Sequence, residues 1–181
     1  MNAAYPTITI DLVLDRLQTR EVLRAVLHAV LFHRLFGTVR PRTFEVLDVT
    51  MPGVDDDGMR QRIEDTVGAF WKGVEGDANK RGQIMVTFSE KRQRKTWFIM
   101  GEEEVPWEQW IINAEIRQPS EKDRQRFNAD LAGTLTKSLH TMLAHASSER
   151  GRAAVPLITD ASSISPFPIK MAVKVGGVEV A

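Results

Sequence analysis

The chain contains no cysteine among its 181 residues, and its positive and negative side chains balance at 24 each. Without cysteine there is no disulfide framework, no thiolate metal site and no cysteine nucleophile. Zero net charge argues against a general nucleic-acid binder, which needs an excess of positive charge. Hydrophobic residues make up 43% and charged residues 27%, which is ordinary for a globular protein. We therefore expect a single domain over residues 1–181 that binds no nucleic acid.

Targeting signals and long apolar runs are also missing. The first residues, MNAAYPTITIDL, have neither a basic n-region nor an apolar h-region. The longest apolar run, VLRAVLHAVLF, is about half the roughly 20 residues that span a bilayer, and it contains Arg24 and His28. These features predict a cytoplasmic protein that does not insert into membranes.

The patterns of catalytic and metal-binding sites are missing too. The four histidines fall in two pairs spaced five residues apart, whereas zinc-binding pairs on helices are spaced three or four apart. Two acidic runs, 55–57 and 102–104, suit solvated turns better than a metal site. No glycine-rich turn has the spacing of a phosphate-binding loop or a dinucleotide fingerprint. We expect no catalytic residue, no metal and no cofactor.

Hydrophobic periodicity predicts an α+β fold. Apolar residues that alternate predict strands, and apolar residues at steps of three and four predict helices. The expected strands are 7–14, 43–51, 83–91, 108–116 and a C-terminal hairpin within 169–181 that turns at Gly176-Gly177; the expected helices are 16–36, 57–75 and 120–148. The prediction is three helices packed on a mainly antiparallel sheet, with the C-terminal hairpin at a sheet edge.

Particular residues are expected to end or cap these helices. Gly37 suits the end of the first helix, and Asp57 suits the N-cap of the second. Ser120 with Asp123 resembles a capping box at the start of the third. Residues 147–168 are rich in Ser, Ala and Pro, and we expect them to form a loop.

The stretch KRQRKTWFIMGEEEVPW, residues 91–107, places four apolar side chains between two charged blocks: Trp97, Phe98, Ile99 and Met100. They either fold back onto the sheet as core or form the solvent-exposed tip of a hairpin. The flanking strands already carry a complete apolar face, and the charged blocks suit a loop that projects into water. An exposed aromatic tip framed by charge is typical of a docking element.

Several motifs in this chain resemble those of one protein family. AVLHAVLFHR (25–34), GQIMVTF (82–88), the basic block that leads into Trp97-Phe98, and EVPWEQW (104–110) have the order and spacing of the autophagy-related protein 101 family. The resemblance covers about residues 5–175. It implies a HORMA-like fold with a mobile C-terminal segment.

The same resemblance implies a function. A member of this family would be a non-enzymatic adaptor subunit of the autophagy-initiating kinase complex. It would pair with the HORMA domain of autophagy-related protein 13 and stabilise it. Trp97 and Phe98 would form a finger that recruits downstream autophagy factors to the site of autophagosome formation. In many family members a proline separates the two aromatic residues, whereas here they are adjacent.

A second reading of the same fold stays open. HORMA domains of the spindle-checkpoint, meiotic and translesion-synthesis types capture a partner peptide beneath a mobile C-terminal safety belt. Residues 150–181 would be that belt here, and they would change position around the peptide.

Overall fold

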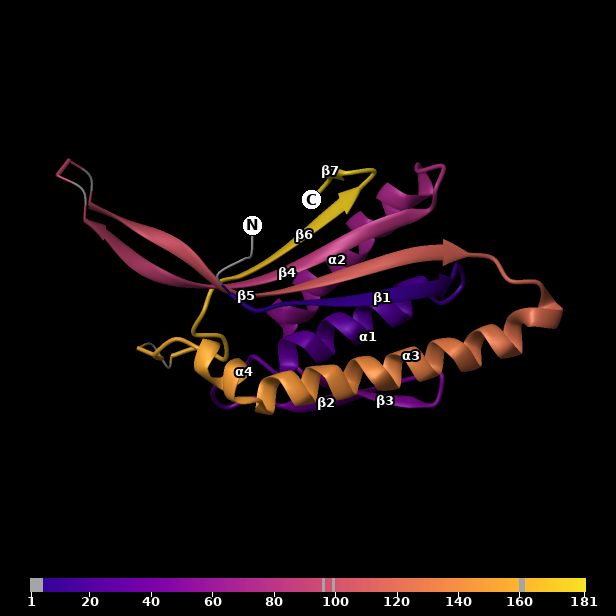
Figure 1. Ribbon diagram of the computed structural model, residues 1–181, viewed down its shortest axis with the longest axis horizontal. Helices are drawn as coiled ribbons and strands as arrows, with labels where there is room; N and C mark the ends of the chain where they lie inside the picture. Colours follow the sequence, from indigo (N-terminus) through magenta and orange to yellow (C-terminus); the bar gives the residue numbers. More distant parts are fainter. Residues whose placement is uncertain (1–4, 96, 99, 160–161) are drawn as a thin grey trace.

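The computed structural model describes residues 5–95, 97–98, 100–159 and 162–181 (Figure 1). Its elements are β1 (Thr7–Asp15), α1 (Thr19–Phe32), β2 (Pro41–Val46), β3 (Val49–Val54), α2 (Asp57–Glu75), β4 (Arg81–Lys95), β5 (Met100–Arg117), α3 (Glu121–Ser147), α4 (Glu149–Ala154), β6 (Ile169–Val175) and β7 (Val178–Glu179).

The larger sheet has five strands in the order β1-β5-β4-β6-β7. β1 runs parallel to β5, and every other neighbouring pair is antiparallel. The α+β class and the mainly antiparallel pairing are confirmed, and the β1 pairing makes the sheet mixed. The C-terminal hairpin lies at the sheet edge as predicted, and Gly176 and Gly177 take positive φ angles of 60° and 78° in its turn.

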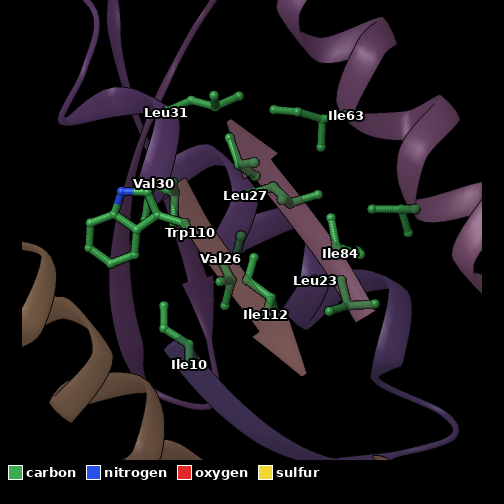
Figure 2. Packing of buried hydrophobic residues seen from close by; sticks show 14 of the residues in the cluster. Ile10, Leu23, Val26, Leu27, Val30, Leu31, Ile63, Ile84, Trp110 and Ile112 are labelled. Atoms are coloured by element: carbon green, nitrogen blue, oxygen red, sulfur yellow. The ribbon is translucent and has the colours of Figure 1, made fainter. Parts of the chain in front are cut away.

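Helix α1 forms the centre of the hydrophobic core. Ten of its 14 residues are buried, so it is covered on most sides rather than along one stripe. It packs against α2, α3, β1 and the small β2–β3 sheet. Figure 2 shows its side chains Leu23, Val26 and Leu27 close to Ile84 and Ile112 of the large sheet.

The structure corrects two predictions about the element order. Residues 43–51, predicted as one strand, belong to a hairpin of β2 and β3, because Leu47 and Asp48 take positive φ angles of 49° and 63° and turn the chain there. The predicted loop 147–168 contains a short fourth helix, α4. Ser148 starts this helix, because its Oγ accepts a hydrogen bond from the backbone N–H of Gly151 at 2.9 Å.

The predicted helix ends are partly right. The bounds of α2 agree with the prediction, but its N-cap is Asp56 rather than Asp57. Ser120 caps α3 as predicted, with the backbone N–H of Asp123 3.3 Å from its Oγ. Helix α1 is shorter than predicted and ends at Phe32, ahead of Gly37.

Helix α3 packs on the core along one face only. Leu131, Leu135 and Met142 are buried, and Leu139 packs against the core from its margin. Leu143 is 60% exposed, because one residue beyond Met142 turns its side chain about 100° away from the sheet.

Candidate functional site

The β4–β5 hairpin extends well beyond the rest of the sheet (Figure 1). β4 pairs with β6 only as far as Phe88, and β5 pairs with β1 only from Gln109 onward. The described residues of 89–106 (89–95, 97–98 and 100–106), called the arm below, therefore form a two-stranded ribbon and its tip, and no third described strand pairs with them.

The tip of the arm holds the two aromatic residues singled out in the sequence. Trp97 is 98% exposed and Phe98 is 96% exposed, so neither packs on the sheet. Ile99, predicted to extend the apolar tip, lies outside the described residues, as does the side chain of Met100. Burial of Trp97 and Phe98 in the core, one of the two readings of the sequence, is thereby ruled out.

Opposite charges line the two strands of the arm. Lys91 lies opposite Glu104, and Arg92 lies opposite Glu103. Lys91 Nζ also lies 3.9 Å from a carboxylate oxygen of Glu102. Cross-strand pairs of opposite charge stabilise a hairpin modestly, and exposed charges discourage the free edges from pairing with other chains. The two charged blocks of the sequence are therefore solvated flanks, as predicted.

A β-bulge marks the base of the arm. Phe88 pairs with Glu108 but Ser89 pairs with Pro106, so Trp107 is an extra residue on β5. The extra residue breaks the alternation of side chains, and both Trp107 and Glu108 become buried. Bulges bend a ribbon and re-aim it, which fits the position of this one where the arm leaves the sheet.

A buried ion pair lies beside the bulge. Arg34, two residues past the end of α1, has a side chain that is 4% exposed, and Glu108 is fully buried. Arg34 donates two hydrogen bonds to the Glu108 carboxylate, at 2.8 and 2.6 Å, and a third to the carbonyl oxygen of Gly151 at 3.0 Å. Trp110 Nε1 donates to Glu108 at 3.1 Å, and His145 Nε2 lies 2.5 Å from the same carboxylate.

The ion pair holds Glu108 in its charged form. Burial by itself raises the pKa of Glu108, but the hydrogen bonds and charge of Arg34, with the hydrogen bonds of Trp110 and His145, outweigh it and leave the pKa below its ordinary value. We call these four residues the Glu108 cluster. It joins β5 to α1 and α3 directly, and to α4 through the carbonyl of Gly151.

Sequence reasoning did not identify the Glu108 cluster. EVPWEQW enters the sequence analysis as a family motif, and His145 enters it only as one of four histidines whose spacing argues against a zinc pair. The available signal was a glutamate between two tryptophans next to an apolar strand, a position where a buried acid needs a partner.

The described residues offer no sign of a metal centre or of a membrane-spanning helix. No three histidine, aspartate or glutamate side chains among them are grouped so that they could hold a metal ion. None of the helices in this part of the chain combines the length and apolar character that a bilayer crossing requires.

Comparison with known proteins identifies the family. Residues 11–162, which include the arm and the Glu108 cluster, match the family described as Autophagy-related protein 101. The chain is 36% identical over 110 residues to Autophagy-related protein 101 of Schizosaccharomyces pombe and 33% identical over 113 residues to that of Arabidopsis thaliana, each match covering 61% of this chain. These matches span 59% and 52% of the two relatives, a little over half of their length. The family resemblance read from the sequence is confirmed, and the chain belongs to the Autophagy-related protein 101 family.

Proposed function

We propose that this protein is a non-enzymatic adaptor in autophagy initiation and that Trp97 and Phe98 are its docking residues. One observation carries the proposal: two adjacent aromatic side chains are almost fully exposed at the end of a long arm. Burying an aromatic side chain against a partner contributes a few kcal/mol, so two of them provide a strong anchor from a small area. Membership of the family links this anchor to autophagy.

The rest of the proposal follows from the family. Residues 1–181 act as a single HORMA domain that works in the cytoplasm and at the site of autophagosome formation. The domain pairs with the HORMA domain of autophagy-related protein 13 and stabilises it. The arm is left free to recruit downstream autophagy factors.

Replacing both Trp97 and Phe98 by alanine tests this function. Because both side chains are exposed, the free energy of unfolding should change by less than about 0.5 kcal/mol. Pairing with the HORMA partner should persist, while pull-down from cell extract should lose the recruited autophagy factors, identified by mass spectrometry.

A matched control uses another exposed apolar pair. Leu157 and Ile158 are 86% and 40% exposed and lie outside the arm. Their double alanine variant should recruit the same factors as the unaltered protein. Equal recruitment by the Trp97/Phe98 variant, or its loss of several kcal/mol of stability, would contradict the proposal.

The peptide-capturing alternative makes a different prediction for residues 150–168. If this segment closes over a peptide, limited proteolysis should show new protection of 150–168 when the partner binds. Unchanged cleavage there favours the adaptor function.

A further inference from the structure

The base of the arm is held by packing around Trp107. The Trp107 ring centroid lies 5.6 Å from that of Phe88 and 5.2 Å from that of Phe167, and the Arg34 guanidinium carbon lies 5.4 Å from it. Trp107 Nε1 is buried and makes no hydrogen bond in the structure. The indole is therefore held by the rings and the cation around it, and loss of one of them changes its support directly.

One of those rings comes from a segment with little support of its own. The described residues 155–159 and 162–168, called the strap, lie between α4 and β6, and the end next to β6 reaches the base of the arm (Figure 1). Among the described residues of the strap, Phe167 is the only buried one. Its ring also contacts Phe36 edge-on, with the centroids 6.0 Å apart. A segment with one buried side chain can open locally at low cost in free energy.

The backbone of the strap also touches the arm. The carbonyl oxygen of Pro168 accepts a hydrogen bond from the N–H of Ser89 at 3.0 Å. Ser89 is the first residue of the arm, directly after the last β4–β6 pair at Phe88 and Ile169. Farther back, the carbonyl oxygen of Ile164 accepts from the N–H of Phe36 at 3.0 Å. The strap thus contacts the arm through a side chain and through its main chain at the point where the ribbon loses its third strand.

We propose that Trp107 and Phe167 are positioning residues for the arm: the seating of Phe167 sets the direction in which the arm leaves the sheet, and release of the strap frees the arm to swing. A ribbon of two strands is only marginally stable by itself, so we expect its direction to depend on the contacts that hold its base. The meaning of this coupling for recruitment rests on the proposed function, because the arm carries Trp97 and Phe98. The coupling itself concerns only the chain's own segments.

The absence of cysteine makes the arm's position measurable. Cysteines introduced at the exposed positions Arg94 on the arm and Lys137 on α3 can each carry a spin label without background. Pulsed electron–electron double resonance then gives the distribution of distances between the label on the arm and the label on α3. The doubly labelled protein with an unaltered strap should show one narrow distribution of distances.

Substitutions at Phe167 should broaden that distance distribution when they remove the ring that contacts Trp107, and should leave it narrow when they keep the ring. Phe167→Ala should roughly double its width while the protein still unfolds cooperatively, because the arm's base is loosened and the core of α1 is untouched. Phe167→Tyr keeps the ring and should restore the narrow distribution. Leu157→Ala is the matched control in the same strap, since Leu157 is 86% exposed and should leave the arm unchanged.

The outcomes decide the coupling and the proposed function separately. A narrow distribution in folded Phe167→Ala would overturn the coupling. If Phe167→Ala does not fold, Phe167→Leu takes its place, because leucine keeps apolar volume without the ring. Distance distributions of equal width for the leucine and tyrosine variants would then overturn the coupling. The spin-label measurement needs no partner. A broadened distance distribution therefore supports the coupling even if the Trp97/Phe98 variant recruits normally. Lost recruitment supports the proposed function even if the distance distribution stays narrow.

Discussion

At the scale of single residues, the buried charges show how burial and pairing interact. Glu108 is fully buried and remains ionised because Arg34 satisfies both of its oxygens. Removing one partner of such a pair typically costs about 3–5 kcal/mol, because the other charge is left without compensation. Loss of either Arg34 or Glu108 would therefore destabilise the contact between β5 and the segment that follows α1. The exposed ion pairs of the arm contribute little to the free energy of unfolding.

His28 is the opposite case, a buried titratable residue without a partner. It lies in α1 with its ring 4.5 Å from Phe44, and neither ring nitrogen makes a hydrogen bond. Burial and the nearby charge of Arg42 lower the pKa of His28 from 6.5 to about 4. In the folded protein this histidine is therefore neutral near pH 5, whereas in the unfolded chain it is mostly protonated.

This pKa shift predicts a pH-dependent stability. The unfolded state binds more protons between pH 6.5 and pH 4, so the contribution of His28 is fully present above pH 6.5 and falls by up to about 3 kcal/mol as the pH drops through that window. The free energy of unfolding, measured with urea at several pH values across this range, should fall less steeply with decreasing pH for His28→Leu than for the unaltered protein. His140→Gln, at an exposed position on α3, should keep the original slope. Equal slopes for the His28 variant and the unaltered protein would show that another group titrates.

At the scale of elements, the corner between α3 and α4 depends on one glycine. Ser148 Oγ donates to the carbonyl oxygen of His145 at 2.7 Å and accepts from Gly151 N–H at 2.9 Å. A Cβ at position 151 would lie 1.8 Å from that same carbonyl oxygen, which is backbone and cannot swing aside. The close approach brings the carbonyl of Gly151 to Arg34 and so links α4 to the Glu108 cluster.

Gly151→Ala is therefore expected to destabilise the protein by about 2–3 kcal/mol, because the corner must open to accept the methyl group. Gly133→Ala is the matched control, since a Cβ there meets nothing within 4 Å and the residue lies within α3. That change should stabilise the protein by about 0.5–1 kcal/mol through helix propensity alone. Equilibrium unfolding in urea measures both, and a neutral Gly151→Ala would show that the corner can relax.

At the scale of the whole molecule, stability is distributed unevenly. The core lies between α1 and the centre of the sheet, where Ile84 and Ile112 are buried (Figure 2). The arm carries no buried side chain between Lys91 and Arg94, and the described residues of the strap carry only Phe167. The molecule thus joins a rigid body to two lightly held segments that meet at Trp107.

Hydrogen exchange should reproduce this division. We expect the slowest amide exchange in α1 and at strand positions 83–87 and 110–114, because these amides open only on global unfolding. Exchange at 91–94 and 155–159 should be faster by orders of magnitude, although the arm residues are paired in a hairpin. Mass-spectrometric exchange of peptides from each region tests this, and an arm as protected as the strand centres would contradict it.

Local sequence pattern was sufficient for much of this molecule. The 19-residue helix α2, the capped α3 and the Gly176-Gly177 hairpin all follow from periodicity, capping and turn chemistry within a short stretch of chain. The same holds for the family, because its motifs are short runs with recognisable spacing. The sequence does not predict the β2–β3 turn, because its two residues with positive φ angles are Leu47 and Asp48, and neither is the glycine or asparagine that usually indicates such a turn.

The remaining features arise from contacts between residues far apart in the chain. Arg34 and Glu108 are separated by 74 positions, so no local pattern pairs them. Whether Trp97 and Trp107 face water or the core depended on where the neighbouring strands end, and the arm became an arm only because β1 and β6 stop at its base. Burial and charge pairing are sums over neighbours in space, and a linear sequence specifies those neighbours only after the chain has folded.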